Sequence, residues 1–200
     1  MGEVERIKAV YEAREAAGLA ARYSLFRPDA LHTQQAIERG LIRTLSRAGL
    51  EDLADKHILD VGCGEGRRLQ RMLDYGASAE NLRGVDLREN VIAAARELNP
   101  GIEFSVVDGK RLLNANASQD IVMQFTVFTS ILDSAMKSSL ASEMLRVLRP
   151  GGLIIWFDYL FNNPNNRDVR GIRKPEIQRL FPGCNVRLKR TVLAPPLARR

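Results

Sequence analysis

The chain is poor in the residues that disulfide, thiol and metal chemistry require. Its 200 residues include two cysteines and two histidines, too few for a disulfide framework. No group of cysteine, histidine and acidic residues has the spacing of metal ligands, so we expect no metal site. The chain also lacks an apolar run of about eighteen residues, and its charged N-terminus has no secretory apolar stretch. We therefore expect a cytoplasmic protein without a membrane partner.

Positive charge is concentrated toward the C-terminus. The formal net charge is +6, yet residues 161–200 hold ten basic and two acidic residues, so the rest of the chain is slightly acidic. Such a segment can bind nucleic acid or another anion, and it can also be an ordinary solvated surface. Phe181 is the one aromatic residue between these charges, which disfavours stacking on single strands. We do not expect nucleic acid as a partner.

The most informative segment is a short apolar run that ends in three glycines. Residues 58–61 are predicted to form a buried strand, and Gly62, Gly64 and Gly66 follow at alternate positions before a helical pattern. This order exposes bare backbone at the carboxyl end of a parallel sheet, where a ligand can approach closely. The spacing departs from the G-x-G-x-x-G dinucleotide pattern, and no G-K-[ST] follows. An ordinary glycine turn is the alternative to a ligand site.

Two acidic residues flank this turn. Asp60 and Glu65 disfavour a pyrophosphate and suit a ligand that carries a cationic amine. An acidic residue followed by G-x-G-x-G resembles the first motif of the class I S-adenosylmethionine-dependent methyltransferases. Asp86 lies twenty residues after Gly66, at the spacing of a carboxylate that accepts from ribose hydroxyls, although it could also cap the next helix. Further strands are predicted over residues 82–86, 102–107, 120–125 and 152–157, in the order that the family has.

The resemblance implies S-adenosylmethionine as cofactor, with S-adenosylhomocysteine as its product. Asp86 would bind the ribose, and Asp108 would accept from the adenine amino group. Cys63 fits the turn through its small size, and no nearby histidine would activate it as a nucleophile. The full set of implied cofactor residues is Asp60, Gly62, Cys63, Gly64, Gly66, Asp86, Leu87, Asp108, Gly109, Gln124 and Tyr23.

The implied fold is α/β, a doubly wound and mostly parallel sheet with helices on both faces. We expect residues 1–50 to form an N-terminal helical lid and residues 51–200 to form the cofactor-binding core, in a single domain overall. The lid would comprise a helix over residues 3–20 and a second helix capped by Asp29. After the fifth strand we expect a loop over the site and a helix over residues 176–181.

A half-buried strand is predicted over residues 184–189. The family's seventh, antiparallel strand has no counterpart in the sequence. Either the chain ends before it, or that strand is replaced or supplied by a partner chain. An open sheet edge would also allow a homo-oligomer to form.

Methyl transfer from a sulfonium demands mainly that the acceptor be held in line, and a general base helps when the acceptor is a hydroxyl. Candidates for that base are Asp133, Asp158, Tyr159 and His32, although Asp133 could simply cap a helix. In the loop after the fifth strand, three arginines could bind an anionic group of the acceptor or pair with nearby acids; they are Arg167, Arg170 and Arg173.

The acceptor is predicted to be a small molecule, such as a hydroxyl-bearing metabolite or a sugar. The Asn-Pro-Pro-Tyr type of signature for nucleobase amino groups is absent after the fourth predicted strand. Two other interpretations stay open. One is an RNA or protein methyltransferase that grips its substrate with the basic C-terminal segment, and the other is a cofactor-binding protein without catalysis.

Overall fold

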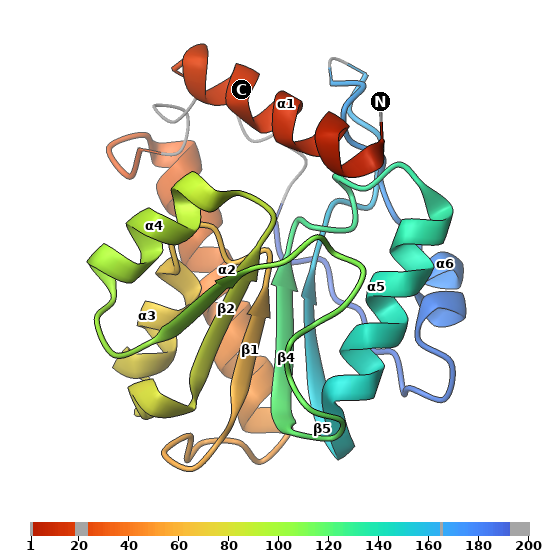
Figure 1. Ribbon diagram of the computed structural model, residues 1–200. Helices are drawn as coiled ribbons and strands as arrows, with labels where there is room; N and C mark the ends of the chain where they lie inside the picture. The colour runs from red at the N-terminus through yellow and green to blue at the C-terminus, as the bar shows by residue number, and fades with distance from the viewer. Residues whose placement is uncertain (1, 19–23, 165, 193–200) are drawn as a thin grey trace.

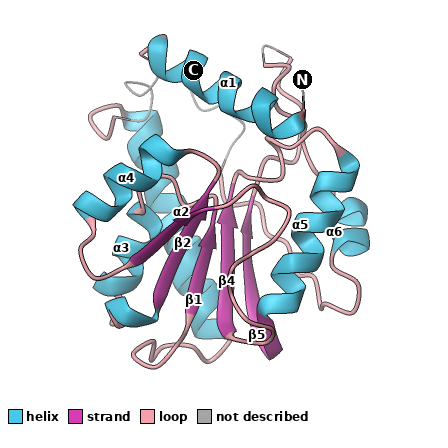
Figure 2. Ribbon diagram, viewed as in Figure 1, coloured by secondary structure: helices cyan, strands magenta, loops and turns pink. Residues whose placement is uncertain are grey.

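Five parallel strands form one sheet at the centre of the molecule (Figures 1 and 2). The computed structural model describes residues 2–18, 24–164 and 166–192. The strand order is β3-β2-β1-β4-β5, so the winding reverses between β1 and β4. In doubly wound sheets, ligands bind outside the carboxyl ends of the strands at such a reversal. The strands are β1 (Ile58–Val61), β2 (Leu82–Asp86), β3 (Glu103–Val106), β4 (Gln119–Phe125) and β5 (Leu148–Phe157).

Helices cover both faces of the sheet, which confirms the predicted fold class. One face packs against α2 (Pro28–Arg47), α3 (Arg67–Asp74) and α4 (Glu89–Leu98), and the short 3-10 helix η2 (Ala79–Asn81) precedes β2. The other face packs against α5 (Ser134–Val147) and α6 (Lys174–Leu180). Figure 1 shows α1 (Glu3–Ala16) lying across the carboxyl ends of the strands.

The core forms because the central strands are apolar on both sides, as parallel strands usually are. All four residues of β1 are buried. Successive side chains point to opposite faces, so Ile58 packs with the cluster that includes α2 and α3, while Leu59 packs with the cluster that includes α5. This two-sided burial fixes the position of the glycine turn that follows β1.

The N-terminal helices differ in detail from the prediction. α1 ends at Ala16, before the predicted end at residue 20. Arg27 is the N-cap residue of α2 and Pro28 begins its first turn, so the assignment of Asp29 as the cap was wrong. α2 packs on a face of the sheet through Leu41 and Leu45, so of the two described N-terminal helices α1 is the one that lies over the carboxyl edge.

Two predictions after α5 also need correction. β5 begins at Leu148, before the predicted start at residue 152, and its register beside β4 is irregular. The predicted strand over residues 184–189 was wrong, because this segment has no strand structure. Val186 packs on the core, but Cys184 and Leu188 are exposed. Alternation of apolar residues cannot make a strand without a neighbouring strand to bond with. No strand follows β5 within the described residues.

Candidate cofactor and acceptor site

The glycine turn after β1 is an open backbone cradle. Gly62 has φ +73° and Gly64 has φ +53°, a region that residues with a Cβ rarely adopt. A Cβ at Gly62 would collide with the side chain of Val127, whereas a Cβ at Gly64 would meet nothing within 4 Å. The turn is thus packed tightly against the loop after β4 on one side and is open at Gly64.

Asp86 is tied to this turn from the neighbouring strand. The Gly64 amide donates to one carboxylate oxygen of Asp86 at 3.0 Å, and the Arg88 amide donates to the other at 3.1 Å. The Arg88 Nε also donates to that second oxygen at 3.4 Å. The N-cap residue of α4 is Arg88, so the alternative role of Asp86 as a helix cap is wrong. The structure therefore brings Gly64 and Asp86 together, as their spacing predicts.

Asp60 is buried with one carboxyl oxygen unpaired among the described residues. Its side chain is 2% exposed, and its Oδ1 has no hydrogen-bond partner among the described residues. Burial raises the pKa of this carboxyl to about 8, with Asp86 adding to the rise and Arg68 opposing it. Ionisation of this buried acid is costly, and a cationic group beside it would lower that cost.

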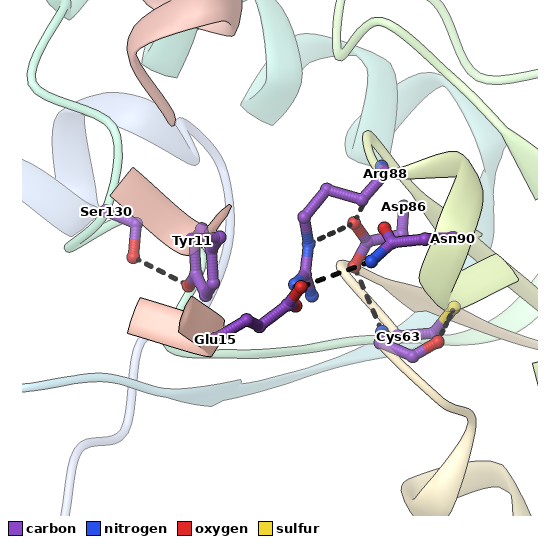
Figure 3. Close-up of polar contacts among 8 residues, drawn as sticks. Tyr11, Glu15, Cys63, Asp86, Arg88, Asn90 and Ser130 are labelled. Atoms are coloured by element: carbon purple, nitrogen blue, oxygen red, sulfur yellow. Dashed lines mark hydrogen bonds and ion pairs between the residues drawn. The ribbon is translucent and has the colours of Figure 1, made fainter. Parts of the chain in front are cut away.

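Helix α1 contacts the site through a cluster of polar groups that Figure 3 shows. Arg88 lies between Asp86 and Glu15 of α1, and its guanidinium pairs with Glu15 at 2.7 Å. Asn90 donates to the same carboxylate at 3.2 Å, and Arg88 lies 4.4 Å from the centre of the Tyr11 ring. The Tyr11 hydroxyl is 3.2 Å from the Ser130 hydroxyl. These contacts hold α1 on the carboxyl edge.

The first turn of α1 is anchored to the loop between β4 and α5. Glu3 accepts from the backbone amides of Leu132 and Asp133, and Arg6 donates to the Ser130 carbonyl at 2.6 Å. Hydrogen bonding to Arg6 lowers the pKa of Glu3 to about 2. Glu3 therefore stays ionised at neutral pH, and α1 is held at both ends.

Asp158 and Gln124 form a second polar cluster, at the carboxyl ends of β5 and β4. One oxygen of Asp158 accepts from the Thr129 hydroxyl at 2.6 Å and from its amide at 3.2 Å. The other oxygen accepts from the Gln124 amide nitrogen at 2.9 Å. Burial raises the pKa of Asp158 to about 6, although these hydrogen bonds favour the ionised form.

The other predicted cofactor residues lie along the same edge. Asp108 is exposed and accepts from the Lys110 amide at 2.9 Å, and Leu87 packs beside Gly109. Cys63 is buried, and burial raises its thiol pKa, so the thiol stays protonated and is a poor nucleophile. Tyr23 lies outside the described residues.

The remaining candidates for a general base are spread widely. Asp133 caps α5 by accepting from the Met136 amide at 2.6 Å, the role that the sequence left as an alternative. His32 is exposed on α2. Tyr159 follows Asp158, and its ring packs edge-on against Phe157. The structure thus brings Asp158 and Tyr159 to the site edge and leaves His32 on a helix of the sheet face.

Sequence reasoning missed Glu15, Arg88 and Thr129. Arg88 had a local signal, because it lies two residues after Asp86. Glu15 and Thr129 had none, because their contacts are made with residues far away in the sequence. Within the described ranges, no three His, Cys, Asp or Glu side chains are grouped as metal ligands would be. None of the helices in that part of the chain has the length and apolar content of a membrane span.

Comparisons with known proteins agree with this geometry. A family model described as a methyltransferase domain matches residues 58–152, which run from β1 into β5. A probable S-adenosylmethionine-dependent methyltransferase of Mycolicibacterium smegmatis is 32% identical over 112 residues, which cover 56% of this chain and 39% of that protein. A trans-aconitate 2-methyltransferase of an Acidovorax species is 30% identical over 131 residues, covering 62% and 43%. The chain spans about two fifths of the length of these curated relatives.

Solved structures show the same fold. A methyltransferase of Methanosarcina mazei, described as dependent on S-adenosylmethionine, superposes with a TM-score of 0.54. It is 21% identical, and the alignment covers 64% of this chain and 77% of that chain. At this level of identity the likeness supports the arrangement of the sheet and helices.

Proposed function

The chain belongs to the class I S-adenosylmethionine-dependent methyltransferases, and from this premise we propose that it transfers the cofactor's methyl group to a small-molecule acceptor. The observation that carries the proposal is the joint placement of Asp86, Gly64 and the buried Asp60, whose Oδ1 has no partner among the described residues, at the carboxyl edge. Bound there, S-adenosylmethionine supplies a methyl group that its sulfonium has already activated.

The residues at this edge fit the cofactor. Asp86 keeps lone pairs for ribose hydroxyls, since each carboxylate oxygen can accept more than one hydrogen bond. The open space at Gly64 lets a ligand lie against the backbone. The Asp60 Oδ1 has no hydrogen-bond partner among the described residues, and a cationic amine beside it would favour the ionised form of this acid, so Asp60 could face the amine of the methionine part. Asp108 is exposed at the neighbouring strand end, where it could accept from the adenine amino group.

Catalysis in this proposal depends mainly on positioning and on excluding water. α1 covers the carboxyl edge, and the loop after β4 packs on the glycine turn. Together they would hold an acceptor in line with the methyl group, which can supply much of the rate enhancement. Both oxygens of Asp158 already accept hydrogen bonds from the protein, so this carboxylate is poorly placed to take a proton from an acceptor hydroxyl.

A small acceptor is supported by relatives such as the trans-aconitate 2-methyltransferase. We propose a hydroxyl-bearing metabolite or a sugar, with an anionic group that Arg167 or Arg173 could bind, because both arginines are exposed in the loop after β5. Arg170 is less available, since it lies 3.6 Å from the Glu176 carboxylate. The cytoplasmic location and the oligomer through an open edge stay predictions.

Two experiments test this function. Titration calorimetry should show binding of S-adenosylhomocysteine and much weaker binding of NAD, because the turn lacks the third dinucleotide glycine. Incubation with methyl-labelled cofactor and a panel of small hydroxyl and carboxylate compounds should then reveal a labelled product by mass spectrometry. Failure to bind S-adenosylhomocysteine, or preference for NAD, would overturn the proposal.

A further inference from the structure

The pair of Asp158 and Gln124 joins the ends of two neighbouring strands. Gln124 is fully buried near the end of β4, and Asp158 follows β5 directly. The Asp158 carboxylate can only accept hydrogen bonds when it is ionised, so it selects the nitrogen end of the Gln124 amide. Gln124 is thereby held in one of the two orientations that its nearly symmetrical amide group could adopt.

That orientation determines what the oxygen end of the amide does. The Gln124 Oε1 accepts from the backbone amide of Val127 at 3.0 Å. If the amide group were reversed, its nitrogen would face the Val127 amide and its oxygen would face the Asp158 carboxylate. Two donors and two acceptors would then oppose each other in a buried place, where unmade hydrogen bonds are costly.

Val127 lies in the loop after β4, and its side chain packs against Gly62 of the glycine turn after β1. We call this turn the cofactor turn, because the proposed function assigns it to the cofactor. The bare Cα of Gly62 faces the Val127 side chain so closely that an added Cβ would collide. The preceding residue, Thr126, has φ +63°, a conformation that a threonine adopts only when its surroundings impose it. Hydrogen bonds to Gln124 and Asp158 help to hold the loop in this path, together with the bond from the Thr126 amide to the Phe157 carbonyl at 2.7 Å.

We propose that Asp158 is a positioning residue whose carboxylate orients the Gln124 amide, so that the loop after β4 holds Val127 against Gly62 of the cofactor turn. Asp158 acts at the site through Gln124 and Thr129 and does not itself touch the reacting atoms. The effect on the loop follows from the contacts alone. The effect on cofactor binding rests on the proposed function.

A swap of side chains tests this chain of contacts. Asp158→Asn places an amide opposite the Gln124 amide, so at least one donor faces a donor. Gln124→Glu alone places two carboxylates opposite each other. The double variant restores a match, since the carboxylate introduced at position 124 would accept from Val127 and from the amide introduced at position 158, whose oxygen would still accept from Thr129. Asp55→Asn, at an exposed position before β1, removes one charge without touching the cluster.

Amide hydrogen exchange measured by NMR reads out the loop without any ligand. We expect Val127 and Thr129 to exchange at least about tenfold faster in each single variant, while Leu59 in β1 keeps its wild-type rate. The double variant should return to within about threefold of the wild type. Wild-type protection in Asp158→Asn, or no recovery in the double variant, would overturn the proposal.

Calorimetry with S-adenosylhomocysteine tests the link to the cofactor turn. Affinity should fall about fivefold or more in the single variants and recover in the double variant, with Asp55→Asn unchanged. If the wild type does not bind this ligand, the proposed function fails while the exchange experiment still decides the role of Asp158. Unchanged affinity beside faster loop exchange would overturn the claim that the loop supports the cofactor turn.

Discussion

The aspartates on the two halves of the carboxyl edge differ in the hydrogen bonds that the protein makes to them. On the β1–β2 side, Asp60 is buried with an oxygen that has no partner among the described residues, and Asp86 is bound mainly by backbone amides. On the β4–β5 side, Asp158 is engaged at both oxygens by side chains of the protein. Burial raises the pKa of both Asp60 and Asp158, but only Asp158 has hydrogen bonds that offset the rise.

This difference supports the proposal that the β1–β2 half of the edge binds the cofactor. A buried acid with an unpaired oxygen and a strongly raised pKa is uncommon, and such groups concentrate at functional sites. A carboxylate that is fully engaged instead organises its own surroundings. On the β1–β2 half, the Asp60 Oδ1 is thus left for a ligand. On the β4–β5 half, both carboxylate oxygens of Asp158 are already bonded to the protein.

The substitution with the largest expected effect is Asp86→Ala, on the β1–β2 half of the edge. We expect S-adenosylhomocysteine affinity to fall by about 1.5–3 kcal/mol, because charged hydrogen bonds to the ribose would be lost. Calorimetry would measure it, with Asp74→Ala as the control, since Asp74 is an exposed acid at the end of α3. A folded Asp86→Ala protein with wild-type affinity would exclude the ribose-binding role.

Asp60→Asn should change how the free energy of unfolding depends on pH. The folded pKa of about 8 is above the ordinary value of 3.8, so the protonated acid favours folding and that contribution is lost as the pH rises toward 8. At pH 8 we expect Asp60→Asn to be more stable than the wild type by about 1–3 kcal/mol, because it removes a buried charge. Urea unfolding between pH 5 and about 8 would show the wild type losing stability relative to the variant. Parallel curves would contradict the prediction.

Asp133→Ala should separate capping from catalysis. Loss of the cap on α5 should cost about 1 kcal/mol of stability, measured by urea unfolding. Cofactor affinity should stay at the wild-type value, because this side chain is exposed and bonds to its own helix. Asp133→Ser, which keeps a capping oxygen, should recover most of the stability. A folded Asp133→Ala enzyme with no turnover would instead support Asp133 as the base.

The smallest effect should come from Glu15→Gln. The pair of Glu15 with Arg88 is partly exposed, so its loss should cost about 0.2–1 kcal/mol in the docking of α1. We expect faster amide exchange in the last turn of α1 and a modestly faster association of S-adenosylhomocysteine by stopped flow. Glu12→Gln, an exposed position on the same helix, is the matched control. Equal association rates in the two variants would show that this contact does not limit entry.

The sequence predicted the arrangement of the β1–β2 half of the edge better than that of the β4–β5 half, for a physical reason. The strand, the glycines and Asp86 are linked by short-range spacing, and a parallel sheet turns that spacing into proximity. The contact of Glu15 with Arg88 joins residues 73 apart, and only packing of α1 creates it. Residues 184–189 alternate like a strand, but they lack a strand to bond with. Asp158 was predicted as a base because the sequence shows its position at a strand end. The sequence does not show that Gln124 and Thr129 donate hydrogen bonds to its carboxylate.

The hydrogen bond between the Gly64 amide and Asp86 has a consequence for the entropy of ligand binding. It joins the turn after β1 to the end of β2 before any ligand arrives. The carboxylate therefore loses its rotational freedom when the protein folds and has little left to lose at complex formation. Preorganisation of this kind strengthens a complex without adding a contact. Loosening that bond would weaken binding through entropy, even if every group that faces the ligand were unchanged.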